Sequence, residues 1–372
     1  MPPSKQKCGI LKKGEDNNVS QKITFYPLGN ADSCLLELSN SKKILFDFAD
    51  KSTGGSEDKR IELSKELAKH TEFDIVLFSH AHDDHVKGSK DFFYLDHAKK
   101  YQSDERKKIS ELWISSAFIL DTDLQSEDAR VIRQEARYRL KEGYGIKVFS
   151  EPDKLNSWLE SNDIEPTERK HLIVHAGTLL PCSNLGKEIE IFVHAPFSAG
   201  SEDVDDKNDP SIVLQVRLTN GNNTTKIILT GDSPYDVLDY IVDISKTNKN
   251  DDYLAWDIYK IPHHCSYTGL AEDKGETRTE PTDQVKELLS LGNDNAILIA
   301  SCDPITEETG PPHIQAKRAY KHYSGDKKLL VTMEYPKSAS PKPLKYEIDE
   351  YGLNELISSV SPIITKPAPR AG

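Results

Sequence analysis

The sequence predicts a layered α/β protein that forms one large domain. Three short strand patterns open the chain, at residues 22–29, 33–38 and 43–50. A helical pattern at 57–70 follows, and then an almost continuous apolar run at 73–80, which is typical of a strand buried on both faces. The second half returns to short strand patterns and a helix. This order of strands and helices favours sheets that are covered by helices.

The remaining elements are expected in the following order. Residues 91–170 are highly charged and mainly helical in pattern, with a strand-like run at 112–117, and we interpret them as a helical insertion. Strand patterns then recur at 171–177, 189–196, 211–218, 226–232, 257–264 and 295–301, with a helical pattern at 282–292. The polar start (1–20) and the Pro-rich end (351–372) are expected to be a flexible segment and a tail. The predicted domain is therefore 21–350.

Composition and charge exclude several classes of protein. The 372 residues include 48 Lys and Arg against 61 Asp and Glu, a net charge of -13, so nucleic acid would need a local site. The five cysteines are scattered without CxxC spacing, which indicates neither a disulfide scaffold nor a thiolate zinc site. No apolar run approaches the ~18 residues of a membrane span, and the first residues lack a signal-peptide core. We expect a cytoplasmic protein without a membrane partner.

The segment "SHAHDDH" carries the strongest chemical signal. It directly follows the buried strand pattern and contains four candidate ligands: His80, His82, Asp84 and His85. Imidazole and carboxylate groups suit zinc and related ions. In an extended loop, His80 and His82 would point to one position and Asp84 and His85 to another. The segment therefore predicts two adjacent metal positions, and the alternative is a polar turn at the end of a strand.

Other candidate ligands also follow apolar strand patterns. They are Asp47, His194, Asp232 and the adjacent pair His263 and His264. Layered α/β folds place their sites at the carboxyl ends of strands, so these side chains are expected to meet. Asp232 follows a glycine and could approach two metal ions closely as a bridge. His194 could equally be a buried structural histidine, and His175 is the alternative if His194 is not a ligand.

These motifs resemble those of the metallo-β-lactamase fold superfamily. "HAHDDH" is similar to the HxHxDH signature of that superfamily. The flanking segments resemble its stand-alone, competence-protein (ComEC-like) group in their order along residues 22–335: "YPLGNADSCLLEL…KILFDFAD", "KNDPSIVLQVRL…KIILTGDSP", "YKIPHHCS" and "ETGPPHIQAKRAY". The resemblance implies a four-layer αββα sandwich with a metal pair at one edge.

The resemblance also implies a role for each motif residue. The first metal would be held by His80, His82 and His194, the second by Asp84, His85 and His263, with Asp232 as the bridge. Asp47 would support the ligand histidines from behind, which fixes their tautomer. His264 is the alternative to His263 as the ligand.

Two positions depart from the family pattern. Cys265 replaces the glycine of HHGS, either as a small buried apolar side chain or as a weak ligand or substrate contact. Pro311 replaces the first histidine of the last motif, whereas His313 keeps the second. Members of this group often lack a histidine in the third motif of the family. A centre with a single metal ion therefore remains an alternative to the expected pair.

The expected chemistry is hydrolysis by a metal-bound hydroxide. Two zinc ions, or manganese ions in their place, would lower the pKa of a shared water from about 15.7 to about 7. We assign Asp84 and His313 to the reaction itself, with His313 stabilising charge on the oxygens under attack.

Three functions stay open. The first is a phosphodiesterase or nuclease, favoured because the resembling group is associated with DNA handling. Basic stretches at 98–108 and 133–147, with interleaved tyrosines, could bind a nucleic acid strand. The second is a hydrolase of a small phosphoester, cyclic nucleotide or lactone, with the insertion as a lid. The third, a binding protein on an inactive hydrolase fold, is disfavoured because HAHDDH, LTGD and the pair His263 and His264 are retained together.

Overall fold

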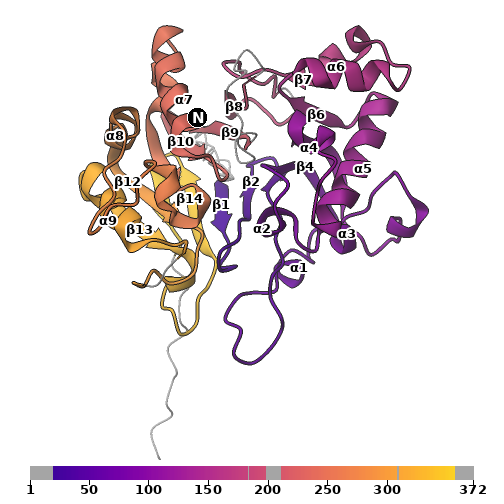
Figure 1. Cartoon of the computed structure of the whole chain (residues 1–372). Helices are drawn as coiled ribbons and strands as arrows, with labels where there is room; N and C mark the ends of the chain where they lie inside the picture. Colours follow the sequence, from indigo (N-terminus) through magenta and orange to yellow (C-terminus); the bar gives the residue numbers. More distant parts are fainter. Residues whose placement is uncertain (1–19, 183, 198–210, 308–309, 357–372) are drawn as a thin grey trace, which may run out of the picture.

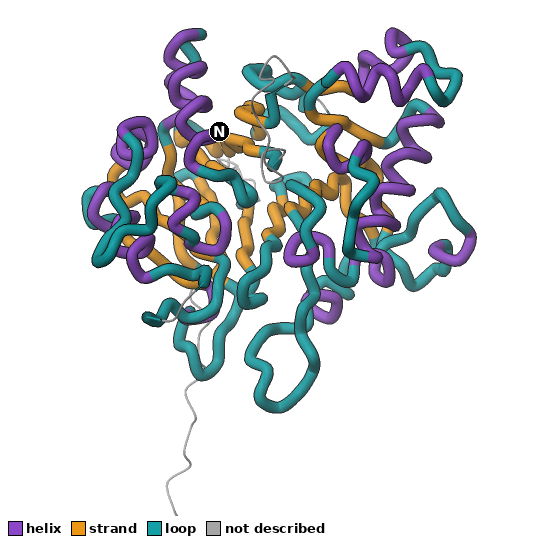
Figure 2. The backbone as a smooth tube through the Cα atoms, in the orientation of Figure 1, coloured by secondary structure: helices purple, strands orange, loops and turns teal. Residues whose placement is uncertain are grey.

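Two β-sheets pack face to face, and helices cover both outer faces (Figures 1 and 2). The computed structural model describes residues 20–182, 184–197, 211–307 and 310–356. Most of the predicted flexible start and part of the predicted tail therefore lie outside the described residues.

The first sheet has nine strands in the order β15-β14-β1-β2-β3-β4-β5-β6-β7 among the described residues. Its strands are β1 (Gln21–Phe25), β2 (Cys34–Glu37), β3 (Lys43–Phe46), β4 (Glu72–Phe78), β5 (Lys108–Ser115), β6 (Ile146–Phe149), β7 (Ile173–Val174), β14 (Leu344–Asp349) and β15 (Gly352–Glu355). The strands β1 to β3, at the three predicted positions, are antiparallel, and β3 to β7 run parallel.

The second sheet repeats this pattern with six strands in the order β13-β12-β11-β10-β9-β8. Its strands are β8 (Ile189–Ala195), β9 (Val213–Asn220), β10 (Asn223–Leu229), β11 (Trp256–Lys260), β12 (Gly292–Ala300) and β13 (Lys328–Val331). The strands β8 to β10 are antiparallel, and β10 to β13 are parallel.

Helices form the two outer layers. Over the first sheet lie α1 (Leu63–Glu66), α2 (Asp83–Val86), α3 (Ser89–Phe92), α4 (Ser116–Leu120), α5 (Glu127–Glu142) and α6 (Asp153–Glu160); over the second lie α7 (Tyr235–Thr247), α8 (Asp283–Ser290) and α9 (Ile314–Tyr323). Short 3-10 turns are η1 (Lys99–Tyr101), η2 (Pro166–Leu172), η3 (Asp251–Leu254), η4 (His263–Cys265), η5 (Tyr267–Gly269) and η6 (Thr332–Glu334). Among the helices described, none combines the length and the apolar character that crossing a bilayer requires.

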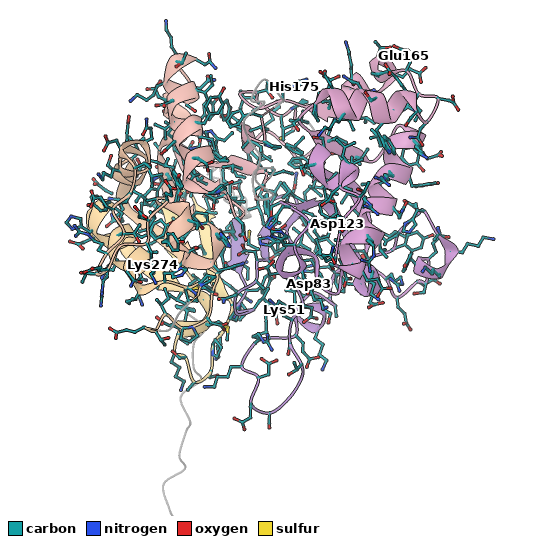
Figure 3. The ribbon with its side chains drawn as sticks, in the orientation of Figure 1. Lys51, Asp83, Asp123, Glu165, His175 and Lys274 are labelled. Carbon is teal, nitrogen blue, oxygen red and sulfur yellow. The ribbon has the colours of Figure 1, made fainter. Side chains whose placement is uncertain are left out.

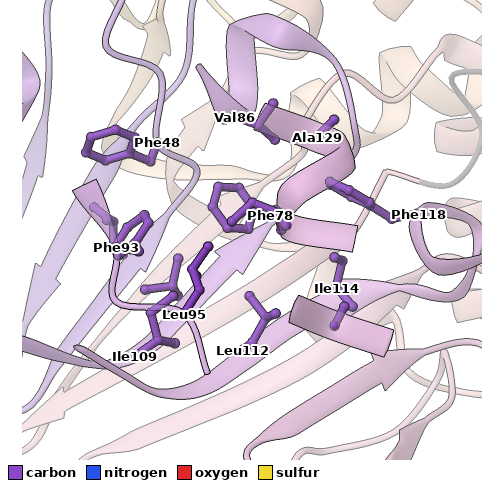
Figure 4. Packing of buried hydrophobic residues seen from close by; sticks show 14 of the residues in the cluster. Phe48, Phe78, Val86, Phe93, Leu95, Ile109, Leu112, Ile114, Phe118 and Ala129 are labelled. Atoms are coloured by element: carbon purple, nitrogen blue, oxygen red, sulfur yellow. The ribbon is translucent and has the colours of Figure 1, made fainter. Parts of the chain in front are cut away.

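Three apolar clusters hold these layers together. Between the sheets, Leu77 of β4 belongs to the same buried cluster as Ile258 of β11. On the outer face of the first sheet, Phe78 packs in a cluster with Phe93 and Ala129 (Figure 4). A third cluster joins the second sheet to α7, α8 and α9. Each fully buried Leu, Ile or Phe side chain contributes about 1.5–3 kcal/mol to the free energy of folding by leaving water. These clusters confirm the predicted αββα arrangement.

Two predicted boundaries are wrong. Residues 91–170 are not an insertion, because β5 and β6 are strands of the first sheet and α5 packs into its outer cluster. The high charge of this segment misled the prediction, since α5 is exposed along one face. The tail also begins later than residue 351, because β15 pairs with β14.

Candidate metal centre

The "SHAHDDH" loop leaves the sandwich at the carboxyl end of β4. Parallel neighbours on both sides hold β4 in place, so Ser79 and His80 are delivered buried at the sheet edge. The single turn of α2 then presents Asp84 and His85. The imidazole atoms His80 Nε2 and His82 Nδ1 lie 3.0 Å apart.

Asp232 enters the centre from the carboxyl end of β10. Its Oδ1 atom is 3.2 Å from His85 Nε2, whereas its Oδ2 atom is 3.8 Å from His80 Nε2. Gly231 makes this approach possible: its φ is +54°, and a Cβ atom there would lie 3.1 Å from the Ser79 Cβ. The two carboxylate oxygens therefore face different histidines, which is the placement that a bridging ligand needs.

The turn after β11 determines which of the adjacent residues His263 and His264 faces Asp84. His263, His264 and Cys265 all have positive φ angles, of 47°, 50° and 63°, in the left-handed region that favours glycine. This turn buries His264, whose Nε2 lies 3.1 Å from Asp84 Oδ2. His263 instead places its Nδ1 3.0 Å from Thr268 Oγ1. His264, the alternative in the sequence prediction, therefore takes the place assigned to His263.

Cys265 is a buried apolar side chain. It is 0% exposed and packs in the cluster under α7, α8 and α9. Burial raises the pKa of its thiol to about 12, so the ligand form, a thiolate, is disfavoured. The second interpretation, a weak ligand or substrate contact, is wrong for this position.

His194 and His175 lie apart from the centre. His194 Nε2 is 3.0 Å from the Tyr253 carbonyl oxygen, and its ring packs against Phe192. His175 lies at the upper end of the view, well separated from Asp83 of the metal loop (Figure 3). The structure therefore corrects both assignments, since β8 presents its histidine to Tyr253 and not to the other ligands.

The buried, neutral state of His194 predicts an acid-sensitive contribution to stability. Burial lowers its pKa from 6.5 to about 4. The contribution of neutral His194 to the unfolding free energy is therefore complete above pH 6.5 and decreases as the pH falls toward 4. For His194→Gln we expect an unchanged metal content. When the pH falls from neutral to about 5, the unfolding free energy of this variant should decrease by about 2 kcal/mol less than that of the wild type. Urea unfolding at both pH values measures this difference. The same substitution at the exposed His175 is the control for metal content, which should stay as in the wild type. A loss of bound metal in His194→Gln would restore the original ligand assignment.

Asp47 lies behind two of the candidate ligand histidines. Its Oδ2 atom is 2.9 Å from His85 Nδ1 and also accepts a hydrogen bond from the Ser79 hydroxyl. If His85 donates from Nδ1, its Nε2 lone pair faces Asp232 and is available to a metal. The Ser79 hydroxyl, which donates to Asp47, can accept from His80 Nδ1 at 3.2 Å. One carboxylate thereby orients two histidines.

Asp32 was missed as a site residue. It lies in the turn "GNADS", where an aspartate before a strand is typical of an ordinary turn. In the structure it is buried, and its Oδ2 lies 3.8 Å from His85 Nε2 and forms an ion pair with Lys260. The one available signal was the match of this turn to the first family motif.

Charge interactions outweigh burial at His85 and Asp232. Burial disfavours the charged form of His85, but the carboxylates of Asp232 and Asp47 outweigh this and raise its pKa well above the usual value. Burial would raise the pKa of Asp232, but His85 and His264 hold it well below its usual range. The centre therefore attracts positive charge, and a metal that displaces these protons would release them.

The donor atoms fit a divalent metal. Two groups each place one ligand atom per residue within 4.8 Å of the others: Asp32, His85, Asp232 and His264, and His80, Asp84 and His85. Within the described part of the chain, His85 Nε2 and Asp232 Oδ1 are buried, face each other at 3.2 Å and form no hydrogen bond with any other group. Buried polar atoms rarely stay unpaired, and imidazole with carboxylate is the ligand set of zinc and manganese.

His313 lies beside the histidine turn. Its backbone N–H donates to the Cys265 carbonyl at 3.0 Å, and its ring packs edge-on against Tyr267 at 5.0 Å between centroids. Its Nδ1 is buried without a hydrogen-bond partner among the described residues. This position lies next to the turn that carries His263 and His264.

Solved structures that are similar to this chain include the two described below. No protein-family model and no curated protein sequence matches the chain. The metallo hydrolase Igni18 from the archaeon Ignicoccus hospitalis is 13% identical, with a TM-score of 0.40, and the match covers 87% of this chain and 98% of that one. Unliganded yeast PDE1 is 10% identical, with a TM-score of 0.41 and coverages of 84% and 97%.

Proposed function

We propose that the protein is a metal-dependent hydrolase of the metallo-β-lactamase superfamily, from its ComEC-like group, and that it cleaves a small phosphodiester. The observation that carries this proposal is the meeting of His80, Asp84, His85, Asp232 and His264 at one sheet edge. These residues come from the ends of three strands that are far apart in the sequence.

The residues of this chain have separable roles in that reaction. His80, His85, His264, Asp84 and Asp232 would hold the metal, with His82 beside His80. A bound divalent ion would supply Lewis acidity and make a water nucleophilic near neutral pH. Asp47 and Ser79 keep the histidine rings oriented, so little reorganisation is needed when charge develops.

Two histidines next to the ligands are suited to contact the substrate. Thr268 fixes the ring of His263, which is partly exposed, and His313 lies directly behind the same turn. Burial lowers the pKa of both rings, so each is a neutral imidazole at physiological pH. A neutral imidazole can donate an N–H to a phosphoryl oxygen or to the leaving oxygen.

A small substrate is favoured over a nucleic acid because Tyr101 and the arginines of the basic stretches are engaged within the protein. Tyr101 is buried beneath Lys100 and Arg106, at 4.7 and 5.3 Å from its ring centroid, and cannot stack on a base. Arg106 donates to the carbonyls of Lys90 and Phe93. The arginines of α5 are used in the same way and donate to backbone carbonyls: Arg130, Arg133, Arg137 and Arg139.

Substrate screening with chelated protein tests this proposal. Bis-p-nitrophenyl phosphate, cyclic dinucleotides, single-stranded DNA, RNA and a lactone are supplied with and without Zn²⁺ or Mn²⁺. We expect turnover of the small diesters that depends on added metal, with little hydrolysis of the polymers. Faster cleavage of DNA would favour the nuclease, and turnover of the lactone alone would favour the other hydrolase. A metal-loaded protein inactive on every ester would contradict the proposal and favour a binding role.

A further inference from the structure

The backbone of Lys51 is fixed beside the loop that carries the candidate ligands. Lys51 follows a short extended segment that pairs with the end of this loop. The Phe48 N–H donates to the His85 carbonyl at 2.9 Å. The Asp50 N–H donates to the Lys87 carbonyl, also at 2.9 Å. Lys51 therefore enters the rim of the metal centre from a backbone that is tied to a candidate ligand.

The side chain of Lys51 is held at the same rim. Its Nζ donates to the Asn30 carbonyl at 3.1 Å. The side-chain amide of Asn30 in turn donates to the Pro311 carbonyl at 3.0 Å. Two residues after Asn30, the Asp32 N–H donates to the Asp84 carbonyl at 3.0 Å. The ammonium group of Lys51 is therefore placed where the segments of Asp84 and Pro311 meet.

The positive charge of Lys51 is not compensated by a carboxylate of the described residues. Other cations of this rim are compensated: Arg60 pairs with Asp58 at 2.8 Å. Lys87 pairs with Asp83 at 3.4 Å, and Figure 3 labels Lys51 in the same region as Asp83. Lys51 instead donates to a neutral carbonyl and is only partly buried. On a chain of net charge -13, such a cation is suited to attract an anion.

The anion that Lys51 suits is a second one, separate from the bond that is cleaved. A phosphodiester carries one negative charge at that bond, and the metal ligands surround the position where this charge would lie. Lys51 belongs to neither candidate ligand group and is separated from Asp32 by the backbone of Asn30. A further charged group of a small substrate can therefore reach Lys51 while the scissile phosphate lies at the metal.

We propose that Lys51 is a substrate-binding residue for a second anionic group, so that the preferred substrate is a small phosphodiester that carries a further phosphate. Asn30 positions the ammonium group for this contact. This inference rests on the proposed hydrolase and adds its substrate class. A charge-assisted hydrogen bond of this kind changes affinity by about 10-fold or more.

Two substrates that differ by one phosphate test this inference: adenylyl-adenosine with and without a 5′-phosphate. We expect the wild type to prefer the phosphorylated form by about 10-fold in kcat/KM, through a lower KM. Lys51→Met should lose this preference, whereas Lys51→Arg, which keeps the charge, should keep most of it. The control is Lys59→Met, which removes the same charge from an exposed position of the same loop. This control should show the preference of the wild type.

The other outcomes are equally decisive. A wild type without the preference, or a Lys51→Met variant that keeps it while both rates fall together, would overturn this inference and leave the proposed hydrolase intact. If no diester is hydrolysed, the proposed function fails, and calorimetric titration of the metal-loaded protein with both dinucleotides decides the inference. Tighter binding of the phosphorylated form that is lost in Lys51→Met would support it, whereas equal binding or none would overturn it as well. Circular dichroism verifies that each variant is folded.

Discussion

Asp232→Asn is expected to abolish metal-dependent hydrolysis, with a loss in kcat/KM on the order of 10³-fold or more. The amide keeps the shape of the side chain but removes the negative charge that faces His85 and His80 at 3.2 and 3.8 Å. A buried carboxylate between these imidazoles is the strongest attraction that the centre offers to a divalent ion. Without it the metal affinity falls, and a water is no longer activated.

Steady-state kinetics and elemental analysis of the purified variant measure this effect. The matched control is Asp236→Asn, which makes the same change on the exposed first turn of α7, four residues further along the chain. That variant should keep wild-type activity and metal content. Full turnover by Asp232→Asn with bound metal would remove Asp232 from the active site.

His264→Gln is expected to lower the metal affinity by about 100-fold or more, whereas His263→Gln should retain the affinity of the wild type. His264 is buried with its Nε2 3.1 Å from Asp84 Oδ2, and its Nδ1 lies 2.8 Å from the Ser301 carbonyl, which fixes the ring. His263 is only partly buried, and its Nδ1 faces Thr268. Competition with a chromophoric chelator gives both affinities.

The two variants differ in the kinetic readout as well. His263→Gln should reduce kcat while the metal stays bound, because it removes a donor to the substrate and not a ligand. The reverse order, with metal lost from His263→Gln and kept in His264→Gln, would show that the turn binds metal through the other histidine. Circular dichroism of both variants controls for the strained turn between residues 263 and 265.

Much of the centre could be predicted because its residues follow strands. A buried strand such as β4 is visible as an apolar run, and the polar residue that ends it must lie at the sheet edge. Asp47, His80 and Asp232 were found in this way, and the structure brings all three together. The layered fold followed from the same pattern of strands and helices.

The wrong assignments have a common physical cause. His194 also ends an apolar run, but its Nε2 is 3.0 Å from the Tyr253 carbonyl, a partner contributed by η3. Asp32 was passed over because its partner, Lys260, is 228 residues away. In both cases the partner is remote in the sequence, so no local pattern could indicate it.

The sequence by itself determined the chemistry: which side chains end buried strands, and that imidazole and carboxylate groups gather there. Local hydrophobic periodicity encodes that information, because burial of a strand depends on its own residues. Only the tertiary structure decided which histidine of the pair at 263 and 264 faces Asp84, and that Lys260 neutralises Asp32 inside the centre. Those outcomes depend on backbone turns and on distances between separate strands, which are set when the two sheets pack together.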